Sequence, residues 1–168
     1  SGPEDGPPLV LLHGFMNTLL IWSPYIADFS KEYRIYAIDI MGHPSKSIPA
    51  EPIGDEAGFV AWLGETLDGL NLDRITLAGI SFGAWIALSF AMAEPQCVRK
   101  LVLLSPAASF QPLSKQFALR AVLSGVIPTR GMMDSFMKWM GLDASSDDGV
   151  TGPLLDLVWL GGQHFRMQ

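Results

Sequence analysis

The sequence is poor in cysteine and in basic residues. Cys97 is its only cysteine, which excludes a disulfide within the chain and leaves nothing that requires an oxidising compartment. Lys and Arg number 11 against 17 Asp and Glu, so the net charge is −6 and no basic stripe is available to neutralise nucleic-acid phosphates. Residues 1–7 have neither a basic start nor an apolar run, so we expect no signal peptide there. These features predict a cytoplasmic protein without a nucleic-acid partner.

One long segment lacks charged residues altogether. Between Arg74 and Glu94 lie 19 uncharged residues, a length that could cross a bilayer as a helix. Residues 75–78 are rich in β-branched side chains, however, and Gly79 and Gly83 would interrupt a helix that began there. A buried strand followed by a buried helix has the same hydropathy, and we expect that arrangement and no membrane span.

The patterns that bind phosphates, dinucleotides or metals are also missing. The sequence has no P-loop, no dinucleotide-binding glycine pattern, and no group of His, Cys and Asp with metal-ligand spacing. We therefore expect neither a cofactor nor a metal ion. Apolar residues are plentiful, at 49% against 17% charged, and this composition predicts a folded chain with a substantial core.

Strand-like and helix-like segments alternate in the first two thirds of the chain. The alternation predicts an α/β fold, with a mostly parallel sheet and helices on both of its faces. After Ser105 and Pro106 only helical segments follow, so we expect a core at residues 1–106 and a helical cap at residues 107–168. The predicted strands are 9–12, 33–40, 75–78 and 98–104, and the predicted helices are 22–29, 55–70, 82–93, 113–125, 132–140 and 153–160.

A serine lies at the junction between the third strand and the helix that follows it. Residues 79–83 read Gly-Ile-Ser-Phe-Gly and fit the G-x-S-x-G pattern, whose glycines allow a tight turn that exposes the serine above the sheet. The helix beginning at Phe82 directs free N–H groups and a partial positive charge to the same place. Ser81 is therefore a candidate nucleophile; the alternative is a tight turn that uses serine only for its small size.

A second motif follows the first strand. In the triplet His13, Gly14 and Phe15, the glycine lets the backbone turn toward the carboxyl edge of the sheet, where open α/β sheets bind ligands. The N–H of Phe15 can then join the N–H of Phe82 in holding the oxyanion of a tetrahedral intermediate. For the His13 side chain we expect hydrogen bonds to the backbone and no catalytic role.

These residues resemble the α/β-hydrolase fold enzymes, particularly small esterases with HGF and GxSxG motifs. The resemblance covers about Pro8 to Leu104 and continues more loosely through the helical segments. It implies carboxylesterase-type hydrolysis of a small-molecule ester, with Ser81 as nucleophile, the N–H groups of Phe15 and Phe82 as oxyanion donors, and the cap as a lid over an acyl or alcohol pocket. Serine at this turn between strand and helix disfavours epoxide and dehalogenation chemistry, which usually has aspartate at that position.

The acid and base of a catalytic triad have no clear position in the sequence. In the family the order is Ser, then Asp or Glu, then His, and the only histidine after Ser81 is His164, which follows a helical segment and no strand. We therefore expect the chain to be the middle of a larger hydrolase, whose acid and base lie elsewhere. The alternative is a non-catalytic, hydrolase-derived fragment that binds a small apolar ligand or a partner protein.

Asp39 and His43 lie in the segment 39–47, which reads DIMGHPSKS where the family often has Asp-x-x-Gly-x-Gly-x-Ser. Asp39 ends a strand near the expected site but precedes Ser81, so we expect it to hold its own loop. His43 and Pro44 depart from the family pattern, and we expect a solvated surface side chain at His43.

Methionine and aromatic residues are concentrated in the second predicted helix of the cap. They could line an adaptable apolar pocket, or they could pack the cap onto the sheet, and the sequence leaves both interpretations open. Asp147 and Asp148 are typical of a solvated turn. The methionine and aromatic residues are Met132, Met133, Phe136, Met137, Trp139 and Met140.

Overall fold

The structure is a computed structural model that divides into two compact units, Ser1–Phe110 and Gln111–Gln168. Each unit has its own helices and its own buried side chains. The assignment of the second unit as a cap over a substrate pocket stays a prediction. The residues that the structure describes are 1–15, 17–43, 53–126, 129–141, 152, 156 and 159.

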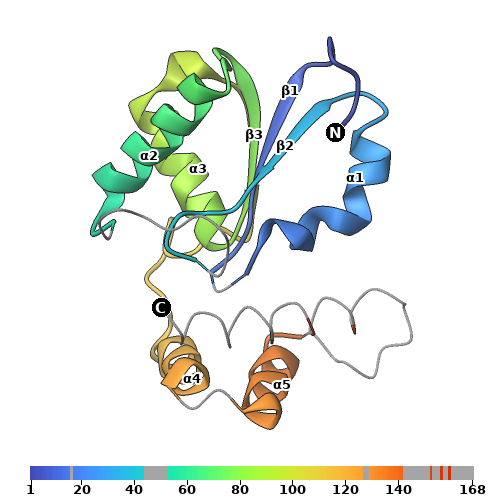
Figure 1. The fold of residues 1–168 in the computed structure, drawn as a ribbon. Coiled ribbons are helices and arrows are strands. Elements are labelled where there is room, and N and C mark those ends of the chain that lie inside the picture. The colour runs from blue at the N-terminus through green and yellow to red at the C-terminus, as the bar shows by residue number, and fades with distance from the viewer. Residues whose placement is uncertain are drawn as a thin grey trace. The chain divides into compact units, whose positions relative to one another are not determined.

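The first unit is a four-stranded sheet covered by helices on both faces (Figure 1). The strand order is β2-β1-β3-β4, and every neighbouring pair is parallel. Helix α1 lies on one face, and α2 and α3 lie on the other, which confirms the predicted α/β fold with a parallel sheet. The elements are β1 (Pro8–Leu12), η1 (Leu19–Trp22), α1 (Ser23–Phe29), β2 (Arg34–Ile38), α2 (Glu56–Gly69), β3 (Ile75–Ile80), α3 (Phe82–Ala93), η2 (Pro95–Cys97) and β4 (Val98–Leu104).

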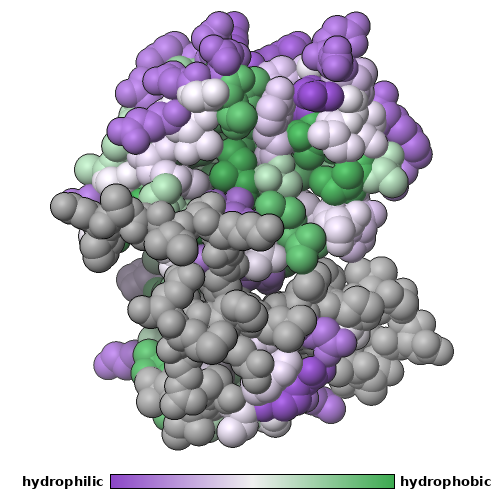
Figure 2. All heavy atoms as spheres, viewed as in Figure 1, coloured by the Kyte–Doolittle hydropathy of each residue, from purple (hydrophilic) through white to green (hydrophobic). Residues whose placement is uncertain are grey.

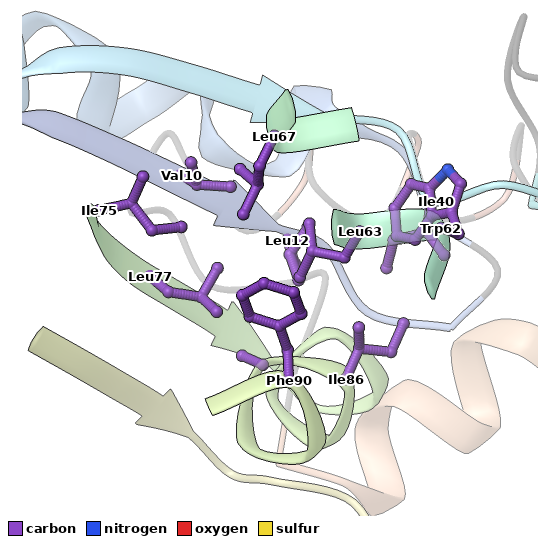
Figure 3. Close-up of a cluster of buried hydrophobic side chains, with 11 residues drawn as sticks. Val10, Leu12, Ile40, Trp62, Leu63, Leu67, Ile75, Leu77, Ile86 and Phe90 are labelled. Carbon is purple, nitrogen blue, oxygen red and sulfur yellow. The ribbon is translucent and has the colours of Figure 1, made fainter. Parts of the chain in front are cut away.

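The core is split by the sheet into two clusters because successive side chains of a strand point to opposite faces. Leu9 and Leu11 of β1 pack with Trp22 on the α1 side, whereas Val10 and Leu12 pack under α2 and α3. Figure 3 shows the larger cluster, in which the Phe90 ring from α3 lies among side chains of the strands and α2. All four of these β1 side chains are buried, as expected for an inner strand that is covered on both faces.

Apolar side chains of the two outer strands reach the surface of this unit. On the face shown in Figure 2, apolar side chains gather over β2, between α1 and α2. A depression of about 500 Å³ there is lined in part by Leu19, Tyr36 and Leu70. On β4, Val102 is 43% and Leu104 is 42% exposed. An exposed strand edge bearing apolar residues is a surface that proteins usually cover, so both outer strands are places where further chain or a partner would add stability.

Apart from α3 and β4, which match, the described elements differ from the predicted ranges by one or two residues at one or both ends, and some of these differences have a clear structural cause. β2 ends at Ile38 and not at residue 40, because the Ile40 N–H donates to the His13 ring (2.9 Å) and not to a strand. β3 continues to Ile80, because this residue still pairs with Leu104 of β4. Helix α2 ends at Gly69 and not at residue 70, because Leu70 is the residue that caps it, and its side chain is 40% exposed.

The second unit contains α4 (Lys115–Val126) and α5 (Arg130–Trp139). Both begin at a capping side chain: the Ser114 hydroxyl accepts from the Phe117 N–H, and the Thr129 hydroxyl accepts from the Met132 N–H. The predicted helix 153–160 lies largely outside the described residues. Among the described residues, no helix is both long and apolar enough to cross a bilayer.

The methionine-rich segment is divided between the interior and the surface of this unit. Met133, Phe136 and Met137 are buried on one face of α5 and pack against Phe117. Met140 is 41% exposed, on the same helix end as the exposed Trp139. Packing is therefore the observed role of the buried three, within the second unit itself. The pocket-lining interpretation stays a prediction for the others.

Candidate active site

Ser81 sits in a sharp turn between β3 and α3. Its backbone has φ 54° and ψ −113°, a left-handed conformation that is rare for residues other than glycine and costs about 1–3 kcal/mol. Four backbone groups hold this turn. The Ser81 N–H donates to the Leu104 carbonyl (2.8 Å), and the Ser81 carbonyl accepts from the N–H groups of Ala84, Trp85 and Ala107 (each 3.1 Å). The strain is thus maintained by β4 and by the first turn of α3.

The glycines on either side of Ser81 are required by close backbone contacts. A Cβ on Gly79 would overlap the carbonyl of Gly83, and a Cβ on Gly83 would overlap the carbonyls of Leu12 and His13. Helix α3 therefore starts directly against the end of β1. This close approach explains why the pattern needs glycine at both positions.

The loop after β1 passes next to Ser81. The position that a Cβ on Gly14 would occupy is 3.5 Å from the Ser81 Cβ. The ring centroids of Phe15, the next residue, and Phe82 are 6.1 Å apart. Because Phe82 is the first residue of α3, its N–H has no acceptor within the helix. The structure therefore brings together the three predicted site residues at the carboxyl end of β1 and β3; their catalytic roles stay predictions.

His13 is completely buried and bonded to the backbone on both sides of its ring. Its Nδ1–H donates to the Gly14 carbonyl (2.8 Å), and its Nε2 accepts from the Ile40 N–H (2.9 Å). Only the neutral ring with the proton on Nδ1 can make both bonds. Burial lowers the pKa of His13, which agrees with that neutral form. Both nitrogens are engaged, so His13 is not available as a base for Ser81.

Asp39 holds the loop that follows β1. Its Oδ1 accepts from the Leu19 N–H (2.7 Å), which lies at the start of η1. The same oxygen is 3.8 Å from the His13 Nε2, but that nitrogen already accepts a hydrogen bond and carries no proton. The two side chains therefore form no ion pair. Asp39 thus ties the carboxyl end of β2 to the neighbouring loop, and the expectation that it also holds its own loop stays a prediction.

His43 is buried, and the prediction of a solvated side chain was wrong. It is 5% exposed, and its ring lies among the rings of His13, Phe15 and Phe82. Burial first, and then the proximity of His13, lower the pKa of His43 to about 4, so the ring is neutral at neutral pH. Gly42, with φ 78°, provides the turn that directs His43 inward. Gly42, directly before His43, was the one signal in the sequence for this turn.

The remaining candidates cannot be placed. His164, weighed above as a possible base, and the pair Asp147 and Asp148 lie outside the described residues.

Comparisons with known proteins agree with this arrangement. A sequence model described as alpha/beta hydrolase fold matches residues 7–139. Over 154 residues the chain is 37% identical to a protein of Bacillus subtilis (strain 168) named uncharacterized carboxylesterase nap, covering 92% of this chain and 49% of that protein. It is 38% identical over 147 residues to carboxylesterase YbfK of the same organism, covering 86% of this chain and 48% of that protein.

Solved structures give the same result for the backbone. The crystal structure of naproxen esterase (carboxylesterase NP) from Bacillus subtilis superposes with a TM-score of 0.86 at 34% identity, over 100% of this chain and 56% of that one. Carboxylesterase CesB (YbfK) from the same species gives 0.84 at 33% identity, over 96% of this chain and 54% of that one. The chain thus spans about half the length of the curated relatives it matches. The matched family and the shared fold, with a Gly-Ile-Ser-Phe-Gly turn between β3 and α3, show that this chain belongs to the α/β-hydrolase fold family.

Proposed function

We propose that this chain carries the nucleophile and the oxyanion hole of a serine carboxylesterase that hydrolyses a small ester through an acyl-enzyme on Ser81. The observation that carries the proposal is the strained conformation of Ser81, at φ 54°, directly beside the loop of Gly14 and Phe15. Strain of this kind is maintained where a site uses it. The carboxylesterase names of two relatives more than 35% identical support the same activity.

The reaction begins when the Ser81 hydroxyl gives its proton to a base and its oxygen attacks the ester carbonyl. The carbonyl oxygen becomes negative in the tetrahedral intermediate, and the N–H groups of Phe15 and Phe82 donate to it. One such donor typically contributes about 3 kcal/mol of transition-state stabilisation, and the N-terminus of α3 adds a partial positive charge. Collapse of the intermediate releases the alcohol, which takes the proton from the base. Water then attacks the acyl group and regenerates Ser81.

The base and its acid partner come, in this proposal, from outside the described residues. Within those residues the histidines are His13, whose nitrogens both bond the backbone, and His43, which packs among rings. The family order places acid and base after the nucleophile, and the relatives extend well beyond the matched part. A three-group arrangement assembled from separate segments is typical of this chemistry, because the triad depends on geometry and not on neighbouring positions.

The test is labelling with a fluorophosphonate, followed by peptide mapping, alongside hydrolysis of 4-nitrophenyl butyrate. We expect a single adduct on Ser81 and loss of hydrolysis in step with labelling, because the reagent reacts with an activated serine. Ser81→Ala should neither label nor hydrolyse. A persistently active Ser81→Ala variant, or an adduct on a different residue, would contradict the proposal. An unlabelled protein that binds an apolar probe would support the non-catalytic binding module instead.

A further inference from the structure

The rings of Phe15, His43 and Phe82 form a closed triangle next to Ser81. The ring centroid of His43 is 5.2 Å from that of Phe82 and 5.3 Å from that of Phe15, whose own separation from Phe82 is 6.1 Å. His43 is stacked on Phe82 at an interplanar angle of 27° and meets Phe15 edge-on at 86°. The three rings come from the loop after β1, the loop after β2 and the first residue of α3. One imidazole therefore links three separate segments of the site.

The turn that carries His43 is held at both ends. At its start the Ile40 N–H donates to the His13 ring (2.9 Å), and at its end the His43 N–H donates to the Ile40 carbonyl (3.1 Å). Gly42 makes the left-handed step between them, with φ 78°. His13 belongs to the same triplet as Phe15, so this hydrogen bond joins the turn to the loop after β1. The His43 ring is thus held in place by its backbone as well as by its neighbours.

The ring contacts bear on the two residues whose N–H groups form the proposed oxyanion hole. The Phe15 side chain is 53% exposed, and His43 and Phe82 are among the residues whose rings contact its own. Donors stabilise an oxyanion only when they lie 2.7–3.1 Å from it, and displacements of a few tenths of an ångström therefore matter. Resting on the proposed function, we infer that His43 is a positioning residue, whose flat ring sets the spacing between the Phe15 and Phe82 backbones.

The ring acts in this role by its shape and not by its charge. Among the described residues, the groups that face it include the apolar rings of Phe15 and Phe82, the backbone of Met41 on its own loop, and His13, which is neutral because its Nε2 accepts a hydrogen bond. A positive charge on His43 would find no carboxylate among these groups. A phenylalanine at this position should therefore replace the ring, whereas an alanine should leave the two donors unsupported.

The experiment compares His43→Ala and His43→Phe with wild type in the purified active protein, using 4-nitrophenyl butyrate at pH 7.5. For His43→Ala we expect kcat to fall by about 10- to 100-fold, with KM changing by less than about threefold, because the donors act mainly on the transition state. For His43→Phe we expect kcat within about fivefold of wild type. The matched control is Ile35→Ala, which removes a buried side chain of β2 from the cluster on the α1 side, where none of the three rings packs, and should keep its kcat.

Equal kcat in His43→Ala and Ile35→Ala would overturn the inference, and so would a His43→Phe variant as slow as His43→Ala. If His43→Ala does not fold, His43→Leu replaces it, because leucine restores apolar volume without a flat ring. A kcat of His43→Leu at least about tenfold below that of His43→Phe supports the inference. Equal kcat in these two variants overturns it. Fluorophosphonate labelling of wild type separates the two proposals. No adduct on Ser81 overturns the function and the inference together, whereas a labelled wild type with a fully active His43→Ala overturns the inference alone.

Discussion

The buried imidazole of His43 makes a quantitative prediction about stability in acid. Its pKa is about 4 in the folded protein against an ordinary value of 6.5, so between these two pH values the unfolded chain binds a proton that the folded protein does not. The free energy of unfolding must therefore fall as the pH falls through this window. At pH 5 the loss relative to pH 7 is about 2 kcal/mol, and at pH 4 it reaches about 3 kcal/mol.

His43→Phe removes this titration and keeps the ring. Any cost of fitting the larger ring is the same at both pH values and cancels when each protein is compared with itself. His13, whose pKa is also lowered by burial, contributes loss of the same sign in both proteins and cancels between them. The difference in acid sensitivity between the two proteins thus measures His43 alone.

The assay is urea unfolding followed by tryptophan fluorescence at pH 7 and pH 5, with linear extrapolation to water. Wild type should lose about 2 kcal/mol more than His43→Phe over this range. Equal losses in the two proteins would refute the reasoning, because they would mean that His43 has the same pKa folded and unfolded, as a solvated side chain would.

Three further predictions concern the backbone around the site. Ser81→Gly should raise the free energy of unfolding by about 1 kcal/mol, because glycine relieves the strain at φ 54°, while hydrolysis is lost; a urea titration against Ser81→Ala, which keeps the strain, tests this. Gly83→Ala should destabilise the protein by about 3 kcal/mol, because the added Cβ meets backbone carbonyls. Gly69→Ala, whose added Cβ meets no atom within 4 Å, should be neutral or slightly stabilising. Thermal unfolding that ranks the stabilities of the two variants otherwise would contradict the packing. Asp39→Ala should cost about 2 kcal/mol by stranding the Leu19 N–H, and Asp39→Asn, which keeps an acceptor, should cost less than half of that in the same unfolding assay.

The fold was predictable from the sequence where local pattern and local structure depend on the same periodicity. Helix α3 and strand β4 have the predicted limits, Phe82–Ala93 and Val98–Leu104, because Gly83 and Pro95 mark the ends of α3 and an apolar run defines β4. The end of β2 was not predictable in this way. Just beyond it, the Ile40 N–H donates to a histidine ring from another loop, and no local pattern encodes such a partner.

The sharp turn that carries Ser81 was predictable for a similar reason. Ser81 lies within five residues whose glycines permit only a tight turn, and the structure confirms the left-handed backbone at φ 54°. The sequence also indicated the loop with Phe15, because a glycine after a strand marks the carboxyl edge of a sheet. The distance between these two segments, in contrast, depends on how closely α3 approaches β1.

By itself, then, the sequence determined which segments form strands and helices, where the serine turn lies, and that the chain resembles the α/β-hydrolase enzymes. Only the tertiary structure decided that His43 is buried against Phe15 and Phe82 and that Asp39 holds the loop after β1. The physical reason is the range of the forces involved. Hydrophobic periodicity and turn propensity act over a few residues, whereas the burial and pKa of a loop histidine depend on which distant rings the folded sheet brings against it.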